Sequence, residues 1–218
     1  MKELIFSPSE FAFGYSGCKR CYYDLKNDNL RVSTAFPSIF SKLDRLQKEF
    51  YHDQNTDVLS ANIEPGKIKT DYEKLQKSET LKDKKGRKFI LRGKIDAYID
   101  HRTFYSIIDF KVTDIDEKKI ELYKTQLLSY AIMFERPNEK CLKLTPIKNL
   151  GIFCFEPEKI HSVNDKPSFN MKTQYYPIQR DDDYLLSFIT EIIDFLEGPK
   201  PIFDEKCGLC NLKKNNFN

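Results

Sequence analysis

An aspartate and a lysine stand two positions apart in the apolar stretch "IDFKV", residues 108–112. Successive side chains on a strand point to opposite faces, so Asp109 and Lys111 would share one face while apolar residues fill the other. An aspartate and a lysine on one face could form part of a catalytic site if a further acidic side chain lies on the same face. The alternative is a solvated strand face that carries a weak ion pair.

Asp96, in the upstream stretch "GKID", is the further ligand that we expect. A hairpin in which Asp100 pairs with Thr103 places Asp96 opposite Ile107 and diagonal to Asp109. Two carboxylates this close repel each other unless a cation lies between them, and oxygen ligands suit Mg²⁺ or Mn²⁺. A neighbouring lysine can orient a water or stabilise charge on a phosphate, so the group predicts metal-assisted phosphodiester hydrolysis.

Gln126 and Tyr130 follow these strands on a predicted helix. They are four positions apart and therefore share one face of that helix. The order "GKID", "DFK", "QLLSY" resembles the PD-(D/E)XK nuclease superfamily, and within it the RecB/AddB-type and CRISPR-associated exonucleases. The resemblance implies DNA as substrate, as single strand or duplex ends, in repair, recombination or phage or CRISPR DNA processing. It also implies roles for five residues and one carbonyl: metal binding by Asp96, Asp109 and the Phe110 backbone carbonyl, catalysis by Lys111, and support of the site or of DNA by Gln126 and Tyr130.

A departure from these relatives concerns a metal-ligating histidine that many of them carry on the helix before the hairpin. Here that helix offers only His52, at its far end. His52 is a weak candidate ligand, since a histidine at a helix C-terminus is favourable without any metal. Asp44, Glu49 or a water could take the ligand position instead. The absent histidine also keeps open a catalytically silent DNA-binding or scaffold module with the same fold.

Four cysteines form a C-x2-C pair near each end of the chain: Cys18, Cys21, Cys207 and Cys210. Four thiolates are the set required for tetrahedral zinc or for a [4Fe–4S] cluster, whereas free cysteines or disulfides are the alternatives. The opening "SPSEF" with "CKRCYY" resembles that of the same exonucleases, whose first cysteine joins three C-terminal ones around [4Fe–4S]. Cys21 stands in for the third C-terminal cysteine. Two C-x2-C pairs suit zinc chemically, whereas the resemblance favours a [4Fe–4S] cluster, and between the two we expect the cluster.

Helical signals mark four stretches: residues 7–18, 36–51, 114–135 and 181–198. The first opens with a capping box at Ser7, and the last is closed by Gly198. The second should bury an apolar face made of Phe36, Ile39, Phe40, Leu43, Leu46 and Phe50. In the third, one side carries Ile120, Tyr123, Leu127, Tyr130 and Phe134.

Strand patterns occupy the centre of the chain, with a hairpin over residues 89–112 and a buried apolar strand over residues 149–156. The charged stretch 66–88 reads as an exposed excursion, and residues 211–218 as a frayed tail. We therefore expect one α/β domain over residues 1–218. Its restriction-endonuclease-like core would be a mixed central sheet flanked by helices, with the chain ends joined by the four-cysteine site.

Composition adds little about partners, because 36 basic and 33 acidic residues leave a net charge of only +3. No apolar run is long enough to span a bilayer, and the opening residues lack a secretory signal, which together favour a cytoplasmic protein. The many Lys, Asn and Ile residues hint at an AT-rich genome, bacterial or phage. The basic run "LKDKKGRK", residues 81–88, could track a phosphate backbone or be a solvated turn. A helicase, recombination or integration partner stays open.

Overall fold

Two β-sheets form the framework of the computed structural model, which describes residues 3–30, 37–70, 74–114, 116 and 120–216. The small sheet contains β1 (Leu4–Phe6), β3 (Gln76–Lys77), β4 (Leu81–Lys82) and β5 (Lys88–Gly93). The large sheet has the order β2 (Lys67–Lys69), β6 (Ala97–Asp100), β7 (Tyr105–Val112), β8 (Ile147–Val163) and β9 (Lys166–Ile178). Parallel pairs join β1 to β5 and β7 to β8, and the other pairs are antiparallel, so both sheets are mixed. The mixed pairing was expected, but in one central sheet, whereas the strands divide between two.

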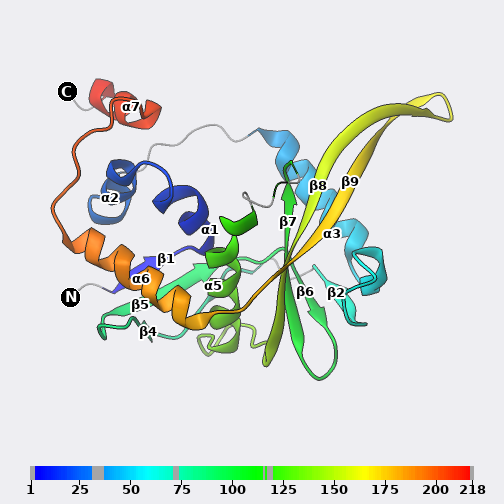
Figure 1. Ribbon diagram of the computed structural model, residues 1–218, viewed down its shortest axis with the longest axis horizontal. Coiled ribbons are helices and arrows are strands. Elements are labelled where there is room, and N and C mark those ends of the chain that lie inside the picture. Colours follow the sequence, from blue (N-terminus) through cyan, green and yellow to red (C-terminus); the bar gives the residue numbers. More distant parts are fainter. Residues whose placement is uncertain (1–2, 31–36, 71–73, 115, 117–119, 217–218) are drawn as a thin grey trace.

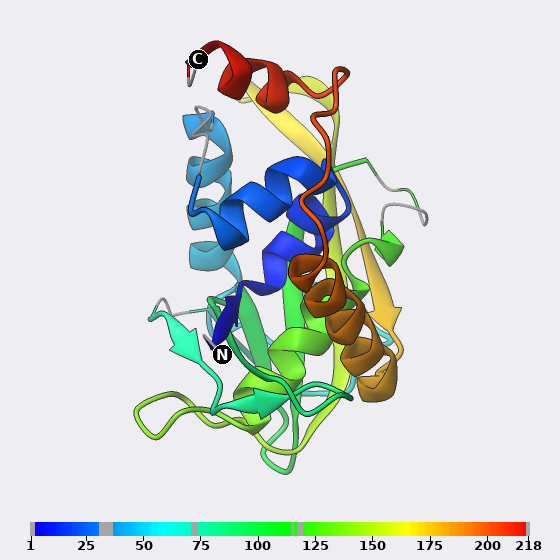
Figure 2. The same cartoon turned by 90° about the vertical axis from the view of Figure 1, so that its left-hand side faces the viewer.

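Helices flank these sheets (Figure 1). They are α1 (Pro8–Glu10), the π-helix η1 (Phe11–Tyr15), α2 (Lys19–Asn27), α3 (Ser38–Tyr51), the 3-10 helix η2 (Thr56–Val58), α5 (Lys124–Glu135), α6 (Asp182–Glu197) and α7 (Gly208–Asn216). Figures 1 and 2 show α7, near the C-terminus, beside α2, near the N-terminus. The α/β class and its flanking helices are thus confirmed, while a restriction-endonuclease-like core stays a prediction. Within the described residues, no helix is long and apolar enough to cross a membrane.

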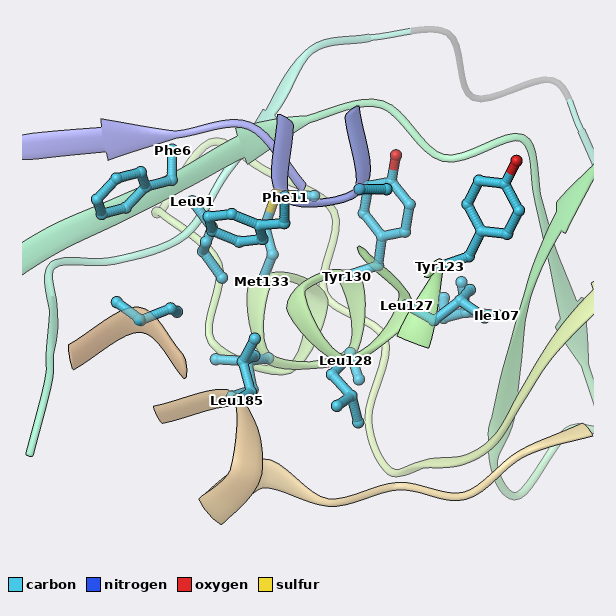
Figure 3. Close-up of a cluster of buried hydrophobic side chains, with 14 of the residues drawn as sticks. Phe6, Phe11, Leu91, Ile107, Tyr123, Leu127, Leu128, Tyr130, Met133 and Leu185 are labelled. Atoms are coloured by element: carbon cyan, nitrogen blue, oxygen red, sulfur yellow. The ribbon is translucent and has the colours of Figure 1, made fainter. Parts of the chain in front are cut away.

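The two faces of strand β7 belong to different hydrophobic clusters. Ile107 packs into the larger cluster with α5 and α6, whereas Ile108 and Phe110 pack into a smaller one with Tyr51 of α3. Helix α5 is buried on every side from Thr125 to Phe134, although the sequence predicted only one apolar face. Figure 3 shows Tyr130 and Leu128 leaving α5 on opposite sides, with Leu128 toward α6. Asp109 and Lys111 lie on the α5 face of the sheet, because they alternate with Ile108 and Phe110.

The predicted strand over residues 89–100 is two strands in two different sheets. Strand β5 ends at Gly93 and β6 begins at Ala97, and the short link between them carries Asp96 from the small sheet to the large one. The hairpin itself is confirmed, but Asp100 pairs with Tyr105 rather than with Thr103. The shift by two residues keeps every side chain on its predicted face. It moves Asp96 from a position opposite Ile107 to one beside Asp109.

The charged stretch 66–88 is not an exposed excursion, since it supplies β2, β3 and β4. Ile68 of β2 and Leu81 of β4 are fully buried, and Ile68 pairs with Ile99 of β6. Short strands with one or two apolar residues show little periodicity, which is why the pattern missed them. The frayed tail is likewise replaced, over residues 211–216, by the second half of α7. Residues 217 and 218 lie outside the described part of the chain.

Helix α3 confirms the predicted helical stretch but not the burial of its apolar face. Phe36 lies outside the described residues, and Ile39, Phe40, Leu46 and Phe50 are all exposed. These side chains face the long β8–β9 ribbon and line one wall of an apolar groove of about 530 Å³. Only Tyr51, at the end of the helix, reaches the core.

The β8–β9 ribbon extends well beyond the buried strand expected over residues 149–156 and projects from the rest of the molecule (Figure 1). Asn164 and Asp165 form its two-residue turn, with φ of 49° and 61°. A hairpin of this type requires positive φ at both central residues, which Asn and Asp tolerate better than most side chains. The dipeptide Asn164–Asp165 therefore was a hairpin signal in the sequence. It was missed because the residues around it are too polar to indicate strands.

Candidate active site and four-cysteine site

Asp96 lies where β6 has not yet begun to pair with β7. Its Oδ2 accepts a hydrogen bond of 3.0 Å from the backbone N–H of Phe110. A strand residue presents its N–H and carbonyl to the same side, so the Phe110 carbonyl should face Asp96 as well. The gap at the start of β6 therefore gathers an aspartate and a backbone carbonyl beside Asp109, which is the ligand set that the sequence suggested.

Asp109 and Lys111 form a close ion pair on the α5 face of the sheet. The Asp109 side chain is 3% exposed and that of Lys111 17%, so the lysine lies nearer the surface. The Lys111 ammonium also stands 5.0 Å from the centre of the Tyr123 ring. A cation over an aromatic face is held by the ring quadrupole, so Tyr123 helps to fix the position of Lys111.

Burial controls the ionisation of this pair. It raises the pKa of Asp109 to about 7, with the Lys111 ammonium opposing and the Asp96 carboxylate adding to this shift. Burial alone would lower the pKa of Lys111, but the carboxylates of Asp109 and Asp96 raise it above its ordinary value. Lys111 is therefore charged at neutral pH. Two carboxylates and one buried ammonium form an electrostatically coupled group in a low-dielectric setting.

Gln126 and Tyr130 lie behind Asp109 and share a face of α5, as their spacing predicted. The Gln126 Nε2 donates to Asp109 Oδ1 over 3.0 Å and to the Tyr130 hydroxyl over 3.1 Å. Burial and then the nearby carboxylates raise the pKa of Tyr130, which keeps its phenol protonated. Both residues are buried, so they position the carboxylate from inside the protein.

Gly93, the glycine of "GKID", allows β5 to approach this group closely. A Cβ atom there would lie 3.0 Å from Cδ of Pro8 and 3.4 Å from Cε1 of Tyr130. Those distances are tighter than ordinary van der Waals contacts, so a side chain would push α1 or Tyr130 away. The glycine thus serves the close packing of β5 against α1 and α5.

His52 does not lie at the carboxylates. Its ring nitrogens are 3.4 Å from the Thr70 hydroxyl and 3.4 Å from a carboxylate oxygen of Asp53. The side chain that α3 directs at Asp96 is Lys48, one helical turn earlier, whose Nζ is 3.2 Å from Asp96 Oδ1. The sequence analysis missed Lys48 because its contact with Asp96 depends on how α3 packs against the sheet.

The oxygen atoms of this site fit a hard divalent cation. Asp109 Oδ2 is buried, and its contact within the described part of the chain is a cation, the Lys111 ammonium. The carboxylates of Asp96 and Asp109 and the Phe110 carbonyl are hard oxygen donors, the ligand type that Mg²⁺ and Mn²⁺ prefer. Asp96, at the outer side, is 21% exposed and gives access from solvent.

The two cysteine pairs meet at the N-termini of two helices that lie side by side. Cys18 caps α2 and Cys21 lies in its first turn, while Cys207 precedes α7 and Cys210 lies within it. All four Sγ atoms lie within 4.8 Å of one another. The expectation that a four-cysteine site joins the chain ends is confirmed as a geometry that could hold a metal.

The separations of the sulfur atoms bear on which metal would fit. They are 3.5 Å for Cys18–Cys210, 3.8 Å for Cys21–Cys207 and 3.5 Å for Cys21–Cys210. Four thiolates about 2.3 Å from one zinc ion have Sγ–Sγ edges of about 3.8 Å. Four irons stand between the thiolates of a cubane cluster, which spreads the sulfur atoms further apart. The three separations are close to the edge for a single ion, and all six lie within 4.8 Å, so the four thiolates could surround one metal ion.

A buried ion cluster that no sequence pattern indicated supports the four-cysteine site. Asp24 of α2 is fully buried and contacts three cations: Arg20 at 3.0 Å, Lys200 at 3.1 Å and Lys213 at 3.0 Å. Lys213, on α7, is itself buried. The cluster therefore ties together the two helices that carry the cysteine pairs.

Three of the five basic residues in the run at residues 81–88 form ion pairs with helix α6, although Lys84 and Lys85 stay exposed to solvent. Lys84 pairs with Asp183 at 2.7 Å, Lys85 with Asp194 at 2.7 Å, and Arg87 with both Asp194 and Glu197. These pairs neutralise most of the run. A phosphate-tracking role for the run therefore stays a prediction, and it would require these exposed ion pairs to exchange for phosphate contacts.

Comparisons with known proteins support the fold alone. The sequence matches no model of a protein family and no curated protein. The structure is similar to the crystal structure of SSO0001, with a TM-score of 0.50 and 16% sequence identity over 92% of this chain and 81% of that chain. Proteins this distant can share a fold and differ in function, so any function must be argued from the side chains.

Proposed function

We propose that this protein is a Mg²⁺- or Mn²⁺-dependent nuclease that hydrolyses phosphodiester bonds in DNA. The observation that carries the proposal is the convergence of Asp96, Asp109 and Lys111 at the start of β6. A hard divalent ion held by two carboxylates polarises a phosphate and activates a water. The resemblance in the ordered motifs adds DNA, as single strand or duplex ends, and an exonuclease mode of attack.

The chain's own residues divide the work of this site. Asp96 and Asp109, with the Phe110 carbonyl, would hold the ion, and Gln126 would keep Asp109 oriented through its 3.0 Å hydrogen bond. Lys111 would stabilise negative charge on the phosphate or orient the attacking water, because its ammonium stays charged at neutral pH. Tyr130 holds Gln126 in turn.

The test is cleavage of end-labelled single- and double-stranded DNA with Mn²⁺, Mg²⁺ or EDTA, with matched RNA alongside. Wild-type protein is compared with Asp109→Asn and Lys111→Ala. Lys148→Ala is the control, since its ammonium lies against Phe104, at 4.8 Å from the ring centre. Metal-dependent cleavage that both site variants lose and the control keeps would support the proposal. Undiminished cleavage by folded Asp109→Asn and Lys111→Ala would remove it.

A catalytically silent DNA-binding or scaffold module is the second candidate. One observation favours it, because lysines already neutralise both carboxylates: Lys48 contacts Asp96 and Lys111 contacts Asp109. DNA binding by metal-replete, folded protein without cleavage under Mg²⁺ or Mn²⁺ would select this candidate. Mn²⁺ binding that depends on Asp96 and Asp109, followed by cleavage, would exclude it.

We also propose that the four-cysteine site holds zinc and stabilises the fold without taking part in the reaction. The short sulfur separations support zinc over the iron–sulfur cluster that the sequence narrowly favoured. Metal and sulfide analysis of anaerobically purified protein is the test. One zinc per chain and a colourless protein are expected, whereas iron and sulfide with visible absorption would overturn the assignment.

A further inference from the structure

We propose that Lys48 serves as a built-in second cation of the Asp96–Asp109 site, so that the site takes one divalent ion. The inference deepens the proposed function and rests on it. It assigns a role to a residue of α3, outside the ordered motifs that the sequence brought to attention.

The Lys48 ammonium bridges two carboxylates. Its Nζ is 3.2 Å from Asp96 Oδ1 and 3.0 Å from Asp44 Oδ2. The side chains of Lys48 and Asp96 are each only 21% exposed, so solvent screens this pair far less than an open surface pair. Both oxygens of Asp96 therefore have partners, because Oδ2 already accepts the Phe110 N–H.

The backbone holds Lys48 at this place. Its carbonyl accepts hydrogen bonds from the Thr70 hydroxyl at 2.7 Å and from the His52 N–H at 3.1 Å. Thr70 is buried, and Tyr51 packs on Phe110 with ring centres 5.4 Å apart. The end of α3 is thus fixed against the strand that carries Asp109, and Lys48 reaches Asp96 from the side of the sheet opposite Lys111.

The charges of the site limit how many ions it can take. Among the described residues, the ion pairs of the site join three carboxylates, Asp44, Asp96 and Asp109, to two ammonium groups, Lys48 and Lys111, and leave a net charge of −1 when all are ionised. One divalent ion changes this net charge to +1, whereas a second would raise it to +3. In two-metal nucleases both ions stabilise the phosphate oxygens. An ammonium is a compact positive charge that can supply part of this stabilisation without a second ion.

Counting bound Mn²⁺ tests the proposal. Free Mn²⁺ is followed by electron paramagnetic resonance during titration of protein whose four-cysteine site is already metal-loaded. Mn²⁺ prefers oxygen ligands to thiolates, so the cysteine site contributes little. We expect one ion per chain in the wild type and in Lys48→Arg, and one more than the wild type in Lys48→Met. Asp44→Asn added to Lys48→Met should remove that extra ion.

Affinity gives a second readout of the same variants. An opposite charge within about 4–6 Å shifts the proton affinity of a carboxylate by about 10- to 1000-fold, and a divalent ion should feel a fixed charge at least as strongly. The first Mn²⁺ should therefore bind at least about tenfold more tightly to Lys48→Met than to wild type. Arg45→Met is the matched control on the same helix, since Arg45 is exposed and pairs with Glu49.

The outcomes separate this inference from the proposed function. Equal numbers of bound Mn²⁺ in Lys48→Met and wild type, with unchanged affinity, would overturn the role of Lys48. If the wild type still bound one ion that Asp109→Asn abolished, the proposed metal site would stand. Wild-type protein that binds no Mn²⁺, with no gain in Lys48→Met, would remove both. Lys48→Gln replaces Lys48→Met if circular dichroism shows that the latter does not fold.

Discussion

Replacing Asp24 by asparagine should destabilise the fold and loosen the four-cysteine site. The substitution removes the anion that three cations share, of which Arg20 and Lys200 are partly exposed and Lys213 is 5% exposed. Burial alone would raise the pKa of Asp24, but hydrogen bonds from Lys213, Lys200 and Arg20 lower it below its usual value. Arg20 and Lys200 can turn toward solvent when the anion is lost, whereas Lys213 would stay buried without its counterion.

The magnitude follows from that one buried ammonium. Breaking a buried ion pair by removing one partner costs about 3–5 kcal/mol, and we expect the lower end, about 3 kcal/mol, because two of the three cations can rehydrate. For a protein of this size the melting temperature should fall by about 6–12 °C. Lys213→Met should cost only about 1 kcal/mol, since Arg20 and Lys200 still neutralise Asp24. The double variant should recover to within about 1 kcal/mol of wild type.

Urea unfolding of the four proteins at pH 5–8 measures these differences. A carboxyl whose folded-state pKa is depressed contributes stability above its unfolded pKa, near 4, and loses it as pH falls through the folded value. The deficit of Asp24→Asn should therefore be constant over this range. Asp28→Asn is the control, because Asp28 pairs with Lys200 and is 37% exposed, and it should cost at most about 1 kcal/mol. Equal stability of Asp24→Asn and wild type would refute the reasoning.

Three further substitutions test the positioning of the two sites. Gln126→Ala removes the hydrogen bond to Asp109 Oδ1 and should lower the rate of metal-dependent cleavage by about 10- to 100-fold. Tyr130→Phe, measured in the same assay, should lose less activity, because Gln126 keeps its hydrogen bond to Asp109. Gly93→Ala places a Cβ against Pro8 and Tyr130 and should cost about 1–3 kcal/mol in urea unfolding. Gly208→Ala is the control, because a Cβ there meets no atom within 4 Å and the backbone φ is not positive. Cys210→Ser should release the metal to a chelator and lower the melting temperature, and Cys141→Ser, outside the four-cysteine site, should do neither. A metal content unchanged in Cys210→Ser would contradict that assignment.

Local signals predicted the elements that depend on local chemistry. Helix α6 begins at Asp182 because Asp181 caps it, accepting a hydrogen bond from the Tyr184 N–H, and it ends before Gly198. The Glu10 carboxylate likewise accepts the Ser7 N–H at the start of α1, as its capping box requires. Caps of this kind involve residues three positions apart, so the sequence contains the whole interaction.

Burial of whole helices was less predictable, because it depends on what packs around them. Thr125 and Ser129 of α5 are polar residues, for which exposure is the usual expectation, but both are buried. The Ser129 hydroxyl donates a hydrogen bond to the Thr125 carbonyl of the same helix. A polar side chain that bonds its own backbone can be buried at little cost, so hydropathy alone understated the burial of α5. In α3 the error was opposite, since an apolar stripe does not say which partner covers it.

The candidate active site shows why a register that was wrong by two residues still brought the same side chains together. Strand side chains alternate with period two, so the two-residue shift from Thr103 to Tyr105 as the partner of Asp100 left Asp96 on the face of Asp109. The same periodicity could not predict Lys48, because this residue belongs to α3 and reaches Asp96 through packing between segments far apart in the sequence. The pattern of a strand thus predicts which of its residues act together. The charged side chain that would limit how many metal ions Asp96 and Asp109 bind is Lys48 of α3, and tertiary packing alone brings it to this site.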